Sequence, residues 1–379
     1  MDFPELKGGS REVTSVRSTF GKLHRLLRAA NSAFFTGDLP KAYETLHDAL
    51  VLFTKLQNKK AIGIASNNLG NVMLAMYRTM KKTGAPSIAC LSDKETIDRG
   101  RRYFRRSINA GEEALERINN EEGWSEKYLI FMQQLSNRYF NRAMFLLTVR
   151  DDHPYPSEAE NQGLTDLSTC KDMDREVVDN GQTVGFKGDE DVYFELLLSR
   201  IKGLLSLMRM GYEDVWGIEE LFEDAKTVLS TALQCPDHTL FRDLEAAGQM
   251  QRLDSALIEY YLLLASKAKN GGGDEVVEKR AEEQEYVKKA AAIATRMLFD
   301  DDYVIGEAGL LALKALLDWT SMCSAEDFAG DDPSDVRSSL FHYRHQVCET
   351  LALSQSWADM LSRESFAAAR MGDFSMESF

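Results

Sequence analysis

The sequence contains little proline and no long uncharged apolar run. Seven prolines and 25 glycines occur in 379 residues, whereas sandwich and barrel architectures use these residues at frequent turns. No apolar run approaches the roughly 20 residues needed to span a bilayer, and the first twenty residues lack the apolar core of a signal peptide. We therefore expect a mostly helical protein without a membrane span or targeting segment.

Cysteine is also scarce and irregularly placed. The five cysteines are Cys90, Cys170, Cys235, Cys323 and Cys348. Their number is odd and no pair has the Cys-x-x-Cys spacing, which argues against both a disulfide framework and a zinc knuckle. This pattern predicts a reducing, intracellular setting, most simply the cytoplasm.

Positive charge is in deficit over the whole chain. Lys and Arg number 45 and Asp and Glu number 60, so the formal net charge is −15. A field of this sign repels phosphate backbones and acidic membrane surfaces. We expect no nucleic-acid partner. The 44 % of hydrophobic residues is ample for a packed core.

Small and large apolar residues alternate at helical spacing between Leu26 and Leu50. The residues concerned are Ala30 and Ala33, then Ala42, Leu46 and Ala49 beyond a Gly37-Asp38 turn. Small residues let two antiparallel helices approach closely while one large side chain fills the gap between them. The segment therefore predicts a helical hairpin.

This hairpin resembles the tetratricopeptide (TPR) repeat, which has small residues at positions 8, 20 and 27 and a large apolar residue at position 24. The matching residues are Ala30, Ala42, Leu46 and Ala49; Gly70, Gly100, Phe104 and Ser107; Ser136, Gly163, Leu167 and Cys170; and, less completely, Leu204, Leu207, Gly211, Ile218, Phe222 and Ala225. The resemblance implies an all-α, α-α superhelix of about five to six hairpins. It also implies a scaffold that binds other proteins.

The predicted organisation has four parts, bounded by the repeat matches and the flanking composition. They are a flexible tail over 1–16, TPR-like repeats over 17–235 with insertions at 81–98 and 151–157, further hairpins over 236–361 that complete or cap the array and contain a linker near 269–275, and a flexible tail over 362–379. Within the capping region, residues 248–268 and 281–300 predict one hairpin, split by the glycine-rich linker.

Asparagine recurs at one position of three successive predicted first helices, as Asn31, Asn71 and Asn137, with Asn68 one turn before Asn71. The resemblance implies that these helices line a concave groove, in which we also place Arg138. An amide can donate to and accept from a peptide backbone at once. Alternatively, each amide bonds a neighbouring repeat or a helix-end carbonyl. The predicted partner is an extended protein segment of basic character.

Some TPR domains clamp the carboxylate of a chaperone tail with two asparagines, two lysines and an arginine. Asn31 and Asn68 match the asparagine positions, but Leu27, Ile130 and Gln134 stand where the cations should be. A terminal carboxylate would have no charge to compensate for its desolvation. The resemblance therefore favours an internal peptide segment over a chaperone tail.

A cluster of arginines lies near residue 100. On a helix, Arg99, Arg102 and Arg106 share one face, and Arg101 and Arg105 form a neighbouring row. Such a cluster suits an acidic or phosphorylated partner. The alternative is a solvated outer face in which the arginines pair with Glu112, Glu113, Glu121 and other local acids.

No catalytic sequence motif is present. His342, His345 and Glu349 share one helix face and could hold zinc, but a closed site needs a fourth ligand. We expect a binding protein with no enzymatic activity, cofactor or metal. Two alternatives stay open: the regulatory region of a larger multidomain signalling protein, and a helical metal-dependent enzyme.

Overall fold

The computed structural model describes residues 25–123, 125–184, 190–212, 217–233, 240–270 and 276–299, with five single positions between 311 and 319. Every regular element in these ranges is helical, apart from an isolated bridge between Ile88 and Leu91. After a first helix over residues 25–35 come α2 (Leu39–Lys55), α3 (Lys59–Thr83), α4 (Asp93–Glu122), α5 (Glu126–Thr148), η1 (Arg150–Asp152), α6 (Pro156–Val184), α7 (Glu190–Arg209), α8 (Ile218–Leu233), α9 (Leu240–Asn270) and α10 (Val276–Phe299). The all-α prediction is confirmed.

The chain divides into two compact units, with the boundary between Gly188 and Asp189. The helices up to α6 belong to the first unit, and α7 to α10 belong to the second. This boundary falls inside the range 17–235, which the repeat pattern treated as continuous. Sequence periodicity alone gave no signal for it.

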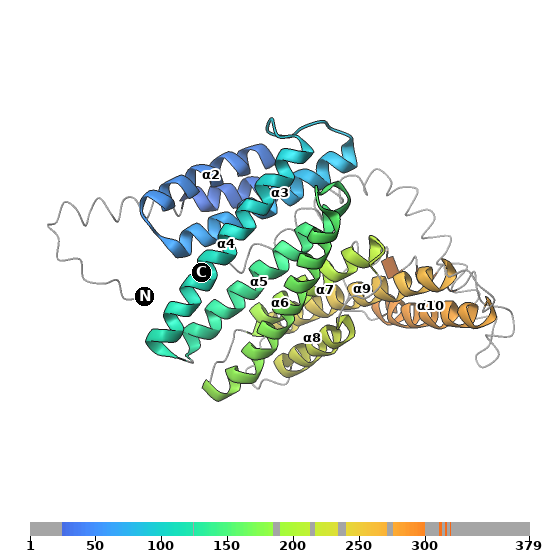
Figure 1. The fold of residues 1–379 in the computed structure, drawn as a ribbon. Helices are drawn as coiled ribbons and strands as arrows, with labels where there is room; N and C mark the ends of the chain where they lie inside the picture. Colours follow the sequence, from blue (N-terminus) through green and yellow to red (C-terminus); the bar gives the residue numbers. More distant parts are fainter. Residues whose placement is uncertain are drawn as a thin grey trace. The chain divides into compact units, whose positions relative to one another are not determined.

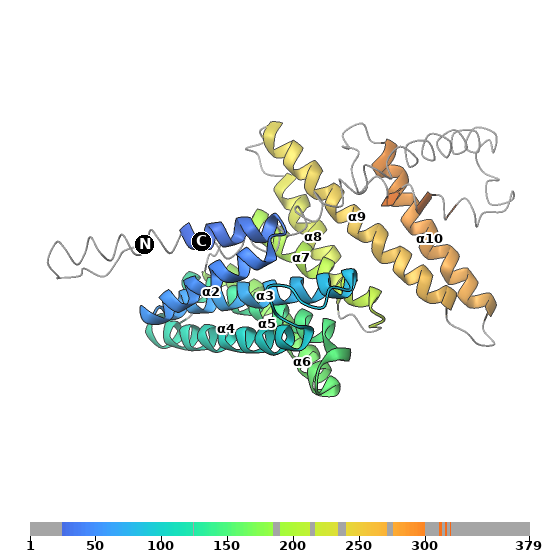
Figure 2. The same ribbon diagram turned by 90° about the horizontal axis from the view of Figure 1, so that it is seen from above.

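In the first unit each helix packs against its neighbours in the chain. Helix α3 lies against α2 and α4, α5 lies against α4 and α6, and these helices are side by side in Figures 1 and 2. Helix α3 also contacts α5, the next helix but one. Such pairing of consecutive helices is the arrangement of a helical-repeat fold.

Polar caps explain where these helices begin. The side chains of Asp38, Asn58 and Ser125 accept hydrogen bonds from backbone N–H groups in the first turns of α2, α3 and α5. Ser92 and Glu95 form a reciprocal capping box at the start of α4. Each cap satisfies a donor that a helix start leaves without a partner.

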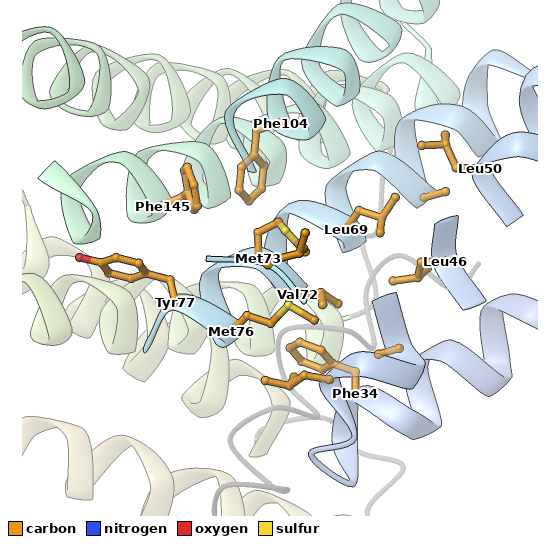
Figure 3. Close-up of a cluster of buried hydrophobic side chains, with 14 of the residues drawn as sticks. Phe34, Leu46, Leu50, Leu69, Val72, Met73, Met76, Tyr77, Phe104 and Phe145 are labelled. Atoms are coloured by element: carbon orange, nitrogen blue, oxygen red, sulfur yellow. The ribbon is translucent and has the colours of Figure 1, made fainter. Parts of the chain in front are cut away.

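Aromatic rings pack onto glycines at the predicted positions. A Cβ added at Gly70 would lie 2.6 Å from the Phe104 ring, and one added at Gly100 would lie 2.4 Å from the Phe145 ring. The two rings, with centroids 5.3 Å apart, lie next to Met73 in the core of this unit (Figure 3). The small residues thus admit a large side chain from the adjoining helix, as predicted.

The two predicted insertions are mostly absorbed by helix. Helix α3 runs through Thr83 and α4 begins at Asp93, so only residues 84–92 form a loop within the range 81–98. Helix α4 is 30 residues long. The second insertion, at 151–157, consists of the end of η1, a short bend and the start of α6 at Pro156.

A charged network joins α3, η1 and α4. The Tyr77 hydroxyl donates to Asp152 at 2.6 Å, and Lys81 Nζ lies 2.6 Å from Asp152 and 2.9 Å from Asp93. The hydrogen bond from Lys81, followed by that from Tyr77, holds the pKa of the Asp152 carboxyl below its usual value. The network therefore favours the ionised form of Asp152.

This lowered pKa predicts a pH-dependent contribution to stability. A depressed carboxyl pKa stabilises the fold above the unfolded pKa of about 3.9, and the contribution is lost as the pH falls through the folded value. We expect Asp152→Asn to lower Tm at pH 7, and the difference from the unchanged chain to shrink below about pH 4. Calorimetry across this pH range tests it, and a difference independent of pH would contradict it.

In the second unit, α7 packs on α8, α8 on α9 and α9 on α10. The hairpin predicted at 248–268 and 281–300 is confirmed as α9 and α10, although both helices begin earlier than predicted. Ile218, Phe222 and Ala225 are buried on α8, as the repeat spacing suggested. The predicted linker at 269–275 lies mostly outside the described residues.

Candidate peptide-binding site

The predicted groove residues lie on three helices of the first unit. Asn31 is half-buried on the helix over residues 25–35, and Asn71 is half-buried on α3. Asn68, on α3, and Asn137 and Arg138, on α5, are buried. The asparagines thus occupy the first helix of successive pairs, as the repeat spacing predicted.

One ridge of α3 remains accessible. Because α3 packs on α2, α4 and α5, most of its residues between Ile62 and Met73 are buried. Five of its accessible residues recur at helical spacing and form this ridge: Ile64, Asn71, Ala75, Arg78 and Lys82. On a helix of regular pitch, Asn67 and Asn68 flank this ridge on opposite sides.

A hydrogen bond between two asparagine side chains connects α3 and α5, which are the first helices of successive pairs. Asn141 Nδ2, on α5, donates to Asn67 Oδ1, on α3, at 3.3 Å. This is the arrangement that the alternative interpretation expected, with an amide bonding a neighbouring repeat. Neither residue was singled out in the sequence, because neither occupies the recurrent asparagine position.

Several other amides on the same helices have hydrogen-bonding capacity that the described residues do not use. Asn31 Oδ1 and Gln134 Oε1 are buried and have no hydrogen-bond partner there. Asn68 and Asn71 likewise make no side-chain hydrogen bond within the described part of the chain. Buried polar atoms without partners are uncommon in folded proteins. The amide face, as we call it, comprises Asn31, Asn67, Asn68, Asn71, Gln134, Asn137 and Asn141.

Gln134 contributes to the candidate site although its sequence position did not predict this. The sequence identifies it only as the residue that replaces a cation of the carboxylate clamp. Its half-buried side chain in fact places a buried amide oxygen on α5, one turn before the buried Asn137. Its alignment with the arginine position of the TPR carboxylate clamp is the sequence signal that could have identified it.

Arg138 has a structural position that corrects its assignment to the groove. Its side chain is buried, and Nη1 donates to the Ser107 carbonyl at 3.0 Å. The guanidinium fills the space beside two glycines: a Cβ at Gly63 or Gly111 would lie 2.6 or 2.8 Å from Nη1. Arg138 therefore joins α5 to α3 and α4, and we leave it out of the candidate site.

The same buried charge affects a nearby lysine. Burial, followed by the positive charge of Arg138, lowers the pKa of Lys60. The Lys60 ammonium lies 5.1 Å from the centroid of the Phe131 ring. This cation–π contact connects α3 to α5 near the amide face.

The arginines of α4 bond to neutral groups. Arg99 Nη1 donates to the Tyr43 hydroxyl, and Arg106 Nη2 donates to Thr54 Oγ1 at 2.7 Å, both on α2. Arg102 Nε donates to the backbone carbonyl of Asp98 at 3.2 Å. Among the described residues, none of the five arginines forms an ion pair with a carboxylate.

The acids expected to neutralise these arginines have other partners. Glu112 accepts from the Tyr139 hydroxyl at 2.6 Å, and Glu113 pairs with Lys59 at 2.9 Å. Glu121 is exposed two turns or more further along α4. Glu112 and Glu113 therefore do not pair with these arginines, whereas Arg102, Arg105 and Arg106 are exposed as the outer-face interpretation expects.

The three residues predicted as possible zinc ligands, His342, His345 and Glu349, lie outside the described residues. Within the described ranges, no three His, Cys, Asp or Glu side chains gather as metal ligands do. No described helix has both the length and the apolarity to cross a bilayer.

No known protein-family model matches the chain, and no curated protein matches it either. Among solved structures, a circular tandem repeat protein with a novel repeat topology and enhanced subunit contact surfaces is 16 % identical. The alignment covers 94 % of this chain and 76 % of that one, with a TM-score of 0.37.

Proposed function

We propose that the first unit is a protein-binding module that holds an extended peptide segment on the amide face. One observation carries the proposal: two buried amide oxygens, Asn31 Oδ1 and Gln134 Oε1, have no hydrogen-bond partner in the described part of the chain. Leaving such a group unpaired costs about 1–3 kcal/mol. Because both side chains are only half-buried, a rotation of each amide would bring its oxygen to a bound backbone N–H, which would remove that cost.

Amides suit the recognition of main chain. An extended peptide presents an N–H and a C=O at each residue, with a rise of about 3.3 Å per residue. The Asn71 amide can accept from one and donate to the other, whatever the peptide's side chains are. The proposed partner is therefore defined by its extended backbone more than by its sequence.

The charge of α3 modifies the predicted partner. Between Lys59 and Thr83 this helix has no Asp or Glu, and its accessible ridge ends in two cations, Arg78 and Lys82. A strongly basic segment would be repelled there. We therefore propose a neutral extended segment, in place of the basic one that the net charge of the chain suggested.

We further propose that the helices over residues 25–184 are divergent TPR-like repeats. The support is the packing of Phe104 on Gly70, a large residue at position 24 against a small one at position 8 of the same repeat. Gly100, at position 20, receives Phe145 from the next helix in the same way. A first-helix binding face agrees with this architecture.

The test uses peptides selected against the full chain from a library of extended sequences. We expect Asn31→Ala/Asn71→Ala to weaken their binding by about tenfold or more, because two hydrogen bonds worth about 1 kcal/mol each are lost. The double variant should not lose thermal stability, because Asn31→Ala removes one unpaired buried oxygen, and Gln134→Leu should raise Tm for the same reason. Isothermal titration and calorimetry measure both.

The matched control is Asn161→Ala, which removes an exposed amide on α6. It should alter neither binding nor stability. The proposal fails if selected peptides bind the double variant as tightly as the unchanged chain, or if the double variant loses binding only together with its fold.

A further inference from the structure

We propose that the arginine ridge of α4, formed by Arg99, Arg101, Arg102, Arg105 and Arg106, binds a short acidic protein segment. This site lies on α4 and the adjoining side of α2, whereas the amide face lies on the helix over residues 25–35, α3 and α5. The ridge therefore takes a second, acidic segment, separate from the neutral peptide that we propose for the amide face.

Positive charge is concentrated here against the trend of the chain. Residues 98–111 contain five arginines and one acid, Asp98, whereas the chain as a whole has a net charge of −15. The rise of an α-helix places the backbone positions of Arg99, Arg102 and Arg106 at intervals of about 4.5 and 6 Å. Arg101 and Arg105 continue the charge around the exposed side of α4.

The fold anchors α4 in this orientation. Its opposite side is buried, with Phe104 packed on Gly70 of α3 and Gly100 packed under Phe145 of α5. The capping box of Ser92 and Glu95 sets where the helix begins. The arginine ridge is thereby held outward by the core rather than by charge pairing.

Within the described part of the chain no carboxylate forms an ion pair with the ridge, although Glu95 lies near enough for the charge of Arg99 to help lower its pKa. Arg99 and Arg106 are bonded to hydroxyl groups of Tyr43 and Thr54, and Arg102 is bonded to a backbone carbonyl. In contrast, Glu113, which lies two turns beyond Arg106 on α4, pairs with Lys59 of α3. Ion pairs therefore form beside the ridge, while its five guanidinium groups retain donors for an external carboxylate.

The bonds to α2 also prepare the ridge for binding. Tyr43 and Thr54 restrict the side chains of Arg99 and Arg106, so less rotamer freedom is lost when a ligand arrives. A guanidinium can bond a carboxylate through two parallel N–H groups. Between these contacts on α2, the exposed His47 adds no negative charge.

An acidic peptide fits better than a nucleic acid. The exposed Glu44 and Asp48 occupy the next face of α2, and the acids of the remaining chain repel a long polyanion. A short segment can place its carboxylates on the ridge without approaching those acids. Its carboxylates would need a spacing of about 4.5–6 Å, which glutamates three and four residues apart on a helix provide.

The experiment measures binding of a dye-labelled peptide of ~12 residues, with glutamates three and four residues apart, to the full chain by fluorescence anisotropy. We expect Arg102→Glu/Arg106→Glu to weaken binding by at least about tenfold, and higher salt to weaken binding to the unchanged chain. The matched control is Arg117→Glu/Arg175→Glu, which changes the net charge equally at two exposed arginines elsewhere. It should change affinity by less than about twofold.

Several results would overturn the proposal. These are no binding of the glutamate peptide, equal loss in the ridge and control variants, equal affinity for a peptide with the same glutamates in one block, or tighter binding of a single-stranded oligonucleotide. Circular dichroism confirms that each variant folds. Because Asn31→Ala/Asn71→Ala should leave glutamate-peptide binding unchanged, failure of this proposal is distinguishable from failure of the amide-face proposal.

Discussion

Replacing Arg142 with alanine is expected to destabilise the first unit by about 3–5 kcal/mol. Arg142 Nε and Nη2 donate to the two carboxylate oxygens of Asp166 at 2.6 and 2.7 Å, joining α5 to α6. The Asp166 side chain is 1 % exposed, and Gln162 supplies a further hydrogen bond at 2.8 Å. Without the guanidinium, a buried carboxylate is left with too little compensation.

Hydrogen exchange of α5 and α6, with denaturant unfolding, measures this loss, since two compact units can unfold separately. Lys59→Ala is the control, because Lys59 and its partner Glu113 are 52 % and 53 % exposed. That surface pair should contribute about 1 kcal/mol or less. Replacing both members, as Arg142→Met/Asp166→Leu, should cost much less than Arg142→Ala. A loss below about 1 kcal/mol for Arg142→Ala would refute the buried-charge explanation.

Phe104→Ala is expected to cost about 3–5 kcal/mol by opening a cavity at the centre of the first unit. The Phe104 side chain is fully buried between Gly70 and the Phe145 ring (Figure 3). Gly70→Ala should also destabilise, by about 1–3 kcal/mol, because its Cβ would lie 2.6 Å from the Phe104 ring. Denaturant unfolding followed at the helices of this unit gives both values.

The effects of the Gly70 and Phe104 substitutions on stability should be coupled. In a Phe104→Leu background the ring that collides with the new Cβ is absent, so Gly70→Ala should cost less there than in the unchanged chain. Gly248→Ala, on α9, is the matched control, since nothing lies within 4 Å of its added Cβ and it is exposed. It should stabilise by about 0.4–1 kcal/mol. Additivity of the Gly70 and Phe104 changes within about 0.5 kcal/mol would contradict direct contact.

The candidate binding surfaces were predictable only in part. The recurrence of Asn31, Asn71 and Asn137 correctly predicted three separate helices, each followed by a helix that packs near it, because helix and turn positions follow from spacing. It did not identify Gln134 or the Asn67–Asn141 pair, whose importance depends on which helices meet. Spacing also predicted that Arg138 lines the groove. Its long side chain instead reaches from α5 to the Ser107 carbonyl on α4.

For the arginine cluster too, the sequence predicted the helix face but not the bonding partners. Sequence spacing correctly placed Arg99, Arg102 and Arg106 on one face of a helix. The acids nearest in the sequence were the expected partners, yet the structure pairs Glu113 with Lys59 and bonds Arg106 to Thr54. Proximity along the chain and proximity in space differ because the side chains of Tyr43 and Thr54, on α2, reach this side of α4.

By itself, the sequence determined the helical class of the described part and the packing of large side chains on Gly70 and Gly100. Both follow from local properties, namely the period of the apolar residues and their volume. Only the tertiary structure decided the boundary after Gly188, the unpaired amide oxygens and the unneutralised arginines. Each of these depends on which helix faces come together, and residues far apart in the chain supply or withhold the partners.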